Sequence, residues 1–106
     1  ITKCENYGYI DSKPKGWHIA GIVGESHVMV SNCTNHGDVR GLTTHIGGIV
    51  GSAIEGGISG CINNGDVIGA GYTAGPNGAW GIGGIAGANE VMVSDCVNNV
   101  KKLLAK

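Results

Sequence analysis

Apolar residues along this chain occur in short pieces rather than in long periodic segments. Three kinds of piece return, of the types I-G-G-I-V-G, V-M-V-S-N-C and N-x-G-D-V, with glycine and asparagine between them. Valine and isoleucine favour the pleated surface of a β-strand, whereas glycine and asparagine supply bends. No piece is long enough to be stable alone, so the pattern predicts short strands that must pair with neighbours.

The pieces belong to two sequence units that alternate along the chain. The unit C-x-N-x-G-x-[IV] and the unit I-[AG]-G-I-[VA]-G each occur three times, and "NCTNHGDV" returns 28 residues later as "GCINNGDV". The copies span 4–10, 33–39 and 61–67 for the first unit, and 19–24, 46–51 and 82–87 for the second. A degraded copy of the first unit starts at Cys96, where Val100 and Lys102 replace its glycine and its branched residue.

Repeats of this length predict an all-β parallel β-solenoid, in which each coil lies about 4.8 Å from the next. A coil of about 28 residues fits a three-sided β-helix, and right-handed crossovers are the default between parallel strands. The chain would supply three to four coils. Glycine on both faces of I-G-G-I-V-G leaves its inward residues undecided. Equivalent residues should form columns: Ile19, Ile46 and Ile82; Ile22, Ile49 and Ile85; Ile10, Val39 and Val67; Val30, Ile58 and Val93.

The repeat pattern assigns 1–98 to the solenoid and 99–106 to a C-terminal tail or cap. Lys102 would fall on a column of branched residues, where a buried unpaired charge is costly, so we expect the backbone to leave the coil near Asn98. The final "VKKLLAK" consists of good helix formers. We expect this segment either to cover the last coil or to be disordered. The chain opens in the middle of the pattern, so it is expected to be an excerpt or a mature product whose first strand edge is open to a partner.

The third interval between repeats is longer than the second because of an inserted loop, 69–80. Each coil must keep its cross-section, so the loop is expected to project outward. Tyr72 and Trp80 lie in this loop and are candidates for contact with a partner, because exposed aromatic residues suit interfaces. The alternative is that Trp80 packs at the edge of its coil, as the equivalent Trp17 would.

Composition narrows the class of protein. The chain has 106 residues with 21 glycines and no phenylalanine, too few bulky side chains for an ordinary compact core. No G-X-Y period indicates collagen, and 42% hydrophobic residues argue against disorder. A formal net charge of −1 without a basic run does not favour nucleic-acid binding, and no apolar run approaches the length of a membrane span.

The Gly-Gly-Ile-Val-Gly and Cys-x-Asn-x-Gly-x-Val units resemble the GLUG repeats of bacterial cell-surface and secreted proteins, which include adhesin-like proteins and the repeat region of IgA-specific metallopeptidases. The resemblance extends from Cys4 to Asn98 and is weaker at both ends and in the loop. It implies an extracellular, repeat-built segment. It does not imply peptidase activity, because the sequence has no H-E-x-x-H zinc helix.

One position of the first unit is always cysteine: Cys4, Cys33, Cys61 and Cys96. Each should point inward as a small apolar residue, so the sequence predicts one column of buried free thiols. Cα atoms about 4.8 Å apart would also permit one or two disulfides, although side chains in a column run parallel to one another. A zinc site is not expected, because four positions in a line do not make a tetrahedron.

A second position of the unit is always asparagine: Asn6, Asn35, Asn63 and Asn98. Asparagine tolerates corners, and stacked amides hydrogen-bond along a column, so we expect a structural role rather than ligand binding. Asp38 and Asp66 flank an inward valine and should therefore point to solvent, away from calcium or acid–base chemistry.

The remaining polar candidates also recur at equivalent positions. His27, Glu55 and Glu90 each stand six residues before a cysteine, and a solvated corner explains them better than a glycosidase pair, which would need an aromatic platform nearby. His18 and His45 match each other, but Gly81 replaces them in the third copy, which disfavours a metal site. We therefore expect no catalytic residue, no cofactor and no metal.

These observations favour a non-catalytic segment of a bacterial surface or secreted protein, acting as a spacer or as an adhesion module. Its partners would be flanking repeats, a second copy bound through the coil edges, or a ligand on a host or cell surface. One alternative is a subunit of a self-assembling fibre. Another is a β-helical polysaccharide-active enzyme, which would need carboxylates that converge in a groove.

Overall fold

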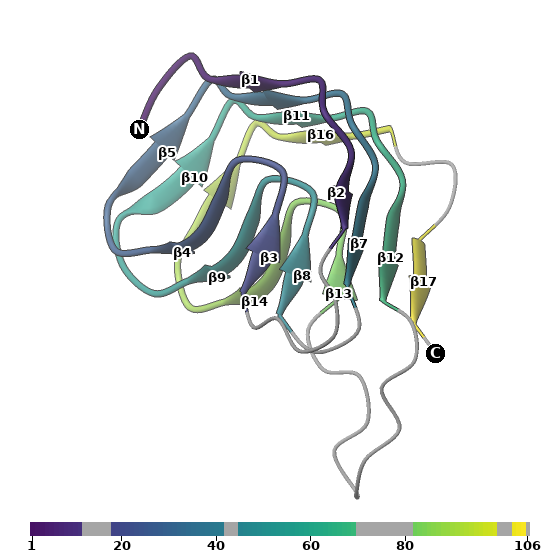
Figure 1. Cartoon of the computed structure of the whole chain (residues 1–106). Coiled ribbons are helices and arrows are strands. Elements are labelled where there is room, and N and C mark those ends of the chain that lie inside the picture. The colour runs from purple at the N-terminus through teal and green to yellow at the C-terminus, as the bar shows by residue number, and fades with distance from the viewer. Residues whose placement is uncertain (12–17, 42–44, 70–81, 100–102, 106) are drawn as a thin grey trace, which may run out of the picture.

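A computed structural model describes residues 1–11, 18–41, 45–69, 82–99 and 103–105. These residues form short strands, β1–β17, of two to four residues each, and they contain no helix (Figure 1). The prediction of an all-β chain is therefore confirmed for the part that the structure describes. Valine, isoleucine and asparagine populate the strands, and glycine separates many of them, as the sequence pattern predicts.

The strands form five sheets. Sheet 1 holds β1 (Glu5–Asn6), β6 (Thr34–Asn35), β11 (Ile62–Asn63) and β16 (Val97–Asn98). Sheet 2 holds β2 (Ile10–Asp11), β7 (Val39–Gly41), β12 (Val67–Gly69) and β17 (Leu103–Ala105). Sheet 3 holds β3 (Ile19–Ala20), β8 (Ile46–Gly47) and β13 (Ile82–Gly83). Sheet 4 holds β4 (Val23–Ser26), β9 (Val50–Ala53) and β14 (Ala86–Asn89), and sheet 5 holds β5 (Met29–Ser31), β10 (Gly57–Ser59) and β15 (Val93–Ser94).

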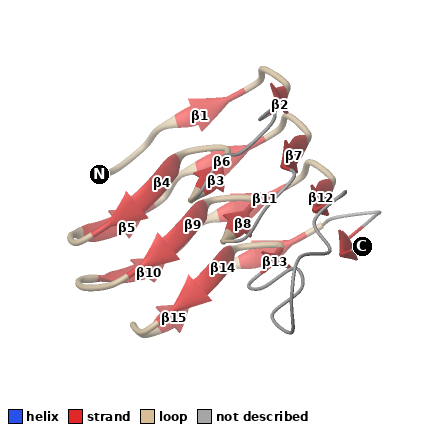
Figure 2. Cartoon of the chain, turned by 60° about the horizontal axis from the view of Figure 1, so that its bottom comes forward, coloured by secondary structure: helices blue, strands red, loops and turns tan. Residues whose placement is uncertain are grey.

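Every strand pairs with the strand that stands five places away in chain order, and every pairing is parallel. One passage of the chain through the five sheets therefore makes one repeat, and the next repeat lies directly on it. Figure 2 shows the repeats as successive layers. This arrangement of stacked parallel sheets is compatible with a parallel β-solenoid.

The strand register matches the predicted columns. Ile19 pairs with Ile46 and Ile46 with Ile82, and the columns of Ile10 and Val30 follow the same rule. In the column of Ile22, the backbone N–H of each isoleucine donates to the carbonyl of the next, at 3.3 and 3.0 Å. The interior consists of two apolar clusters, one lined by sheets 4 and 5 and the other by sheets 2 and 3.

A corner in the backbone determines which residues of I-G-G-I-V-G point into the core. β8 ends at Gly47 and β9 begins at Val50, so the piece belongs to two sheets and not to one strand. Ile46, Ile49 and Val50 are all fully buried. Alternation in a single strand would have placed Ile49 and Val50 on opposite faces. The corner removes that restriction, so both side chains enter the core.

The end of the chain corrects one prediction. The repeat does not stop near Asn98, because β17 adds a fourth strand to sheet 2 and pairs with β12. The residue that pairs with Val67 is Leu103 and not Lys102. One additional residue between β16 and β17 thus moves the lysine off the column and places a leucine there. The tail is a strand over Leu103–Ala105, neither helical nor disordered, and it covers the edge of β12 as the capping alternative expects.

The inserted loop lies outside the described residues apart from Gly69, which belongs to β12. Tyr72 and Trp80, the two aromatic residues proposed for partner contact, are likewise outside the described residues. Their role therefore stays a prediction from the sequence.

Candidate functional site

The residue before each cysteine has a left-handed backbone conformation. Lys3, Asn32, Gly60 and Asp95 have φ angles of 54°, 54°, 62° and 53°. Glycine, asparagine and aspartate adopt this conformation more readily than other residues, which explains their use at this corner. The corner turns the chain from sheet 5 into sheet 1 and directs the next side chain toward the interior.

The cysteines that follow these corners are all free thiols. Cys33 and Cys61 are buried, whereas Cys96 is partly exposed and Cys4 is exposed, so the prediction of a wholly buried column is wrong at its ends. The cause is position, because Cys4 lies in the first repeat of the stack and Cys96 in the last. Burial raises the pKa of the Cys61 thiol to about 11. The Cys61 thiol therefore stays protonated and unreactive near neutral pH.

The asparagines form a continuous column of amide hydrogen bonds. Asn6 Nδ2 donates to Asn35 Oδ1 at 2.9 Å, Asn35 Nδ2 to Asn63 Oδ1 at 2.8 Å, and Asn63 Nδ2 to Asn98 Oδ1 at 3.0 Å. The second N–H of each middle amide donates to the carbonyl two residues later, on Gly37 or Gly65. Asn35 and Asn63 are fully buried. The column thus joins successive repeats, and water does not reach the two amides in its middle.

Glycine in the second sequence unit makes room for these amides. A Cβ atom on Gly21 would collide with the Asn35 amide, and one on Gly48 would collide with the Asn63 amide and with the Gly84 carbonyl. Asn35, Asn63 and Asn98 therefore each pack against a glycine of the preceding repeat. This contact explains why the two sequence units occur together in every repeat.

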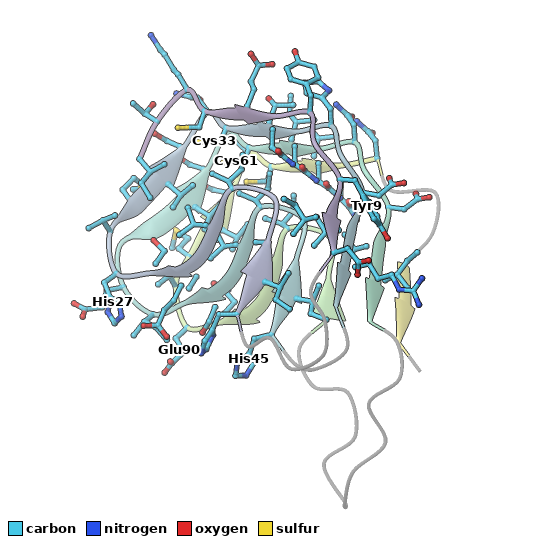
Figure 3. All side chains as sticks on the ribbon, viewed as in Figure 1. Tyr9, His27, Cys33, His45, Cys61 and Glu90 are labelled. Carbon is cyan, nitrogen blue, oxygen red and sulfur yellow. The ribbon has the colours of Figure 1, made fainter. Side chains whose placement is uncertain are left out.

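A second group of polar residues lies on the outer edge of sheets 3 and 4, where Figure 3 labels His27 and His45. We call it the His–Glu cluster, and it comprises His18, Glu25, His27, His45 and Glu55. Glu25 lies 3.5 Å from His18 Nε2 and 3.0 Å from His27 Nε2, and His27 Nδ1 lies 3.5 Å from Glu55. The rings of His18 and His45 stack with centroids 4.9 Å apart. Contacts between side chains of one repeat and the next therefore run through the cluster.

The pKa values of His27 and His45 shift in opposite directions. Hydrogen bonds to Glu25 and then to Glu55 raise the pKa of His27. Burial, followed by the neighbouring His18, lowers the pKa of His45. The hydrogen bond from His27 also lowers the pKa of Glu25. Nδ1 of His18 and Nδ1 of His45 are buried without a hydrogen-bond partner, so protonating His45 adds a donor that no acceptor receives.

A third group lies outside sheet 1, at the position after each asparagine of the column. The Tyr7 ring stacks on the His36 ring with centroids 4.4 Å apart, and Glu5 Oε1 lies 3.2 Å from both Tyr7 Oη and His36 Nε2. Asn64 and Asn99 continue this row, joined by a hydrogen bond of 2.8 Å. Tyr7 remains 72% exposed. Sequence analysis missed this group, although the four residues share one repeat position that could have revealed it.

The acidic residues singled out in the sequence lie at outer corners. The Asp66 N–H donates to Asp38 Oδ1 at 2.9 Å, so Asp38 caps the backbone of the next repeat. Glu55 and Glu90 are exposed at the same corner of successive repeats, but Asn89 pairs with Ala53, so Glu90 lies opposite Ile54 and not opposite Glu55. The contact between His18 and Glu25 was not predicted from the sequence, since His18 precedes β3 and Glu25 lies seven positions later in β4.

The described segments contain neither a candidate metal centre nor a helix that could span a membrane. No group of three or more His, Cys, Asp or Glu side chains in these segments could hold a metal ion. No helix long and apolar enough to cross a membrane occurs among the residues described. Comparison with family models, with curated proteins and with solved structures found no match to this chain. The resemblance to GLUG repeats rests on the two sequence units alone.

Proposed function

We propose that the chain is a right-handed parallel β-solenoid of three to four coils, which acts as a non-catalytic spacer or adhesion module in a bacterial surface or secreted protein. The observation that carries the proposal is the continuous asparagine column. It ties each repeat to the next by the same amide–amide hydrogen bond, from Asn6 to Asn98, and the middle bond is buried. A structure built by repeating one contact can be extended without limit, which is what a spacer requires.

The outer polar groups favour this role over an enzymatic one. Glycoside hydrolysis needs two carboxylates on opposite sides of the scissile bond. Glu55 and Glu90 instead occupy the same corner of successive repeats, and Glu25 is engaged by His18 and His27. The resemblance to GLUG repeats supports an extracellular location and an adhesive or spacing role.

Force spectroscopy on single chains tests the mechanical part of this proposal. A spacer should resist extension until the stack breaks, and Asn35→Ala should lower the unfolding force more than Asn6→Ala, which removes an amide from the first repeat only. Equal unfolding forces for the two variants would contradict the role of the buried column. Binding to an array of cell-surface glycans would then separate an adhesion module, which binds, from a spacer, which does not.

Release of reducing ends from neutral and acidic polysaccharides tests the enzymatic alternative. We expect release at the level of the buffer control. Release that the chain carries out and that the double variant Glu55→Gln, Glu90→Gln abolishes would overturn the non-catalytic assignment.

A further inference from the structure

The corner between sheets 4 and 5 is not built alike in every repeat. Ser26 pairs with Ala53 in sheet 4, and Met29 pairs with Gly57 in sheet 5. Three steps along the chain lead from Ser26 to Met29, whereas four steps lead from Ala53 to Gly57. The second repeat therefore has one additional residue at this corner, within 54–56. Such a bulge is a defined feature of a fold, and bulges often lie next to functional sites.

Two glycines at the end of the bulge have backbone conformations that other residues rarely adopt. Gly56 and Gly57 have φ angles of 103° and 136°. A Cβ atom on Gly56 would collide with the carbonyl carbon of Val28, so a larger residue does not fit there. The first repeat has Val28 and Met29 at the equivalent positions, and the third repeat has the same pair, V-M. The second repeat therefore leaves a place without a side chain between two methionines.

The Met29 side chain lies over this place. Its Cε and Sδ atoms are 3.4 and 3.5 Å from the position of a Cβ atom on Gly57. Val28 and Met29 nevertheless remain 53% and 49% exposed, whereas the next residue, Val30, is fully buried. Strand β5 has paired chain on both sides, with β10 on one and Thr2 on the other. Met29 is therefore exposed because it points outward from sheet 5, and not because the stack ends beside it.

Acidic residues lie next to this apolar surface. The side chains of Glu25 and Glu55 are 44% and 73% exposed, and Glu90 is exposed at the same corner of the third repeat (Figure 3). The strands of sheets 4 and 5 and the corners between them contain no lysine and no arginine. His27 is their only basic side chain, and it already contacts Glu25 and Glu55. The surface is thus apolar on sheet 5 and acidic along the corner.

This charge excludes several kinds of partner. An anionic membrane or an acidic polysaccharide would be repelled by the glutamates. Two copies of the chain related by a two-fold axis would bring Glu55 against Glu55. A peptide segment that has lysine or arginine next to apolar side chains complements both parts of the surface. Methionine suits such a contact, because its flexible thioether adapts to apolar side chains of different shapes.

We propose that Val28, Met29 and Glu55 form a docking surface for a segment of another protein that carries lysine or arginine beside apolar side chains. The apolar side chains of the partner cover Val28 and Met29, and its cation lies beside Glu55. This inference names the partner of an adhesion module, so it rests on the adhesive form of the proposed function. A chain that acts only as a spacer has no such partner.

Selection of random peptides displayed on phage, with the whole chain as the target, tests the proposal. The enriched peptides should combine lysine or arginine with apolar residues, and their synthetic forms should bind more weakly as salt is added. Glu55→Gln should weaken binding about fivefold and Met29→Gln about tenfold. Val97→Gln is the matched control, because Val97 is 48% exposed but belongs to sheet 1. Enriched peptides without a basic residue, or equal losses in Met29→Gln and Val97→Gln, would overturn the proposal.

NMR of the methionine methyl groups locates the bound peptide. Met29 and Met92 are the two methionines of the chain, and they lie in one column of sheet 5 on either side of Gly57. Labelling of these methyl groups therefore gives two signals, and Met29→Gln identifies the signal of Met29. A selected peptide should shift that signal, and a peptide that binds without shifting it would overturn the placement.

The same signals distinguish the kinds of partner. Vesicles of anionic lipid should leave the Met29 signal unchanged, and a shift on their addition would overturn the choice of a protein partner. The unfolding force of Asn35→Ala and binding to the glycan array do not depend on this corner. Failure of peptide docking would therefore leave the proposed function standing, whereas equal unfolding forces for Asn35→Ala and Asn6→Ala would contradict the proposed function and not the docking surface.

Discussion

The asparagine column and the His–Glu cluster both connect one repeat with the next, but they differ in burial and in regularity. The column keeps one residue type in all four repeats, and its middle amides are fully buried. The cluster places His27 and then Glu55 at equivalent corners, and its side chains are about half exposed. Water can replace a bond of the cluster, whereas water does not reach the bond between Asn35 and Asn63 in the middle of the column. The buried contact therefore keeps the same residue type in every repeat, whereas the exposed contact does not.

The free-energy cost of a substitution depends on whether it leaves a buried polar group without a hydrogen-bond partner. A buried donor or acceptor without a partner costs about 1–3 kcal/mol, whereas an exposed ion pair contributes less than about 1 kcal/mol. Substitutions along the column should therefore affect the free energy of unfolding strongly in the middle repeats and weakly at the edge. Substitutions in the cluster should instead change how that free energy depends on pH.

The largest effect is expected where glycine packs against the column. Gly48→Ala places a Cβ atom against the Asn63 amide and the Gly84 carbonyl, and backbone cannot move aside as a flexible side chain can. We expect a loss of about 3 kcal/mol in unfolding free energy, measured by urea denaturation. Gly8→Ala is the matched control, because its Cβ would meet only Asn6 Oδ1 at an ordinary 3.6 Å. Similar losses in both variants would contradict the packing argument.

A smaller loss is expected from removing a middle amide. Asn35→Ala deletes the donors to Asn63 Oδ1 and to the Gly37 carbonyl and leaves both acceptors buried. We expect a loss of about 2 kcal/mol in the same urea experiment. Asn6→Ala removes an edge amide and should cost less than about 1 kcal/mol. If the edge variant lost as much as the middle one, burial would not be the deciding factor.

The His–Glu cluster should show two pH dependences of opposite sign. The folded-state pKa of His45 is lowered, so the unfolded chain binds protons more readily and stability falls as pH drops below the unfolded pKa, near 6.5. The folded-state pKa of His27 is raised, so its stabilising contribution is fully present below the unfolded pKa and is lost as pH rises through the folded pKa.

Two variants separate these contributions. His45→Asn suits the left-handed backbone at this position and should flatten the loss of stability on acidification. His27→Gln should remove stabilisation on the acid side and change little at pH values above the raised folded-state pKa, where His27 is neutral. Thermal melting of both variants between pH 5 and pH 8 makes the comparison. Shifts of the same sign in the two variants would show that the cluster acts as one unit.

Much of the interior followed from the sequence because the columns repeat a residue type at a fixed spacing. The column of Ile19, the column of Val30 and the asparagine positions needed only the alignment of the repeats. The inward residues of I-G-G-I-V-G did not follow, because the corner between Gly47 and Val50 is a backbone feature that alternation cannot reveal.

Other features were not predicted from the sequence, because they depend on a shift in strand register or on contacts between different positions of the repeat. The strand at Leu103–Ala105 was missed because one additional residue changes the register after Asn98. The contact of His18 with Glu25 was missed because the two residues occupy different positions of one repeat. The exposed thiol of Cys4 reflects its place at an edge, which a repeat alignment treats as equivalent to the middle.

Exchange of side-chain amide protons, followed by NMR, tests most directly whether a buried asparagine column joins the repeats. The matched reference within the same chain is Asn89, which makes the same kind of bond to the carbonyl two residues later but is exposed. The side-chain N–H protons of Asn35 and Asn63 should exchange at least about a hundredfold more slowly than those of Asn89. Exchange of all three at similar rates would mean that water reaches the column, and it would contradict the role assigned to it.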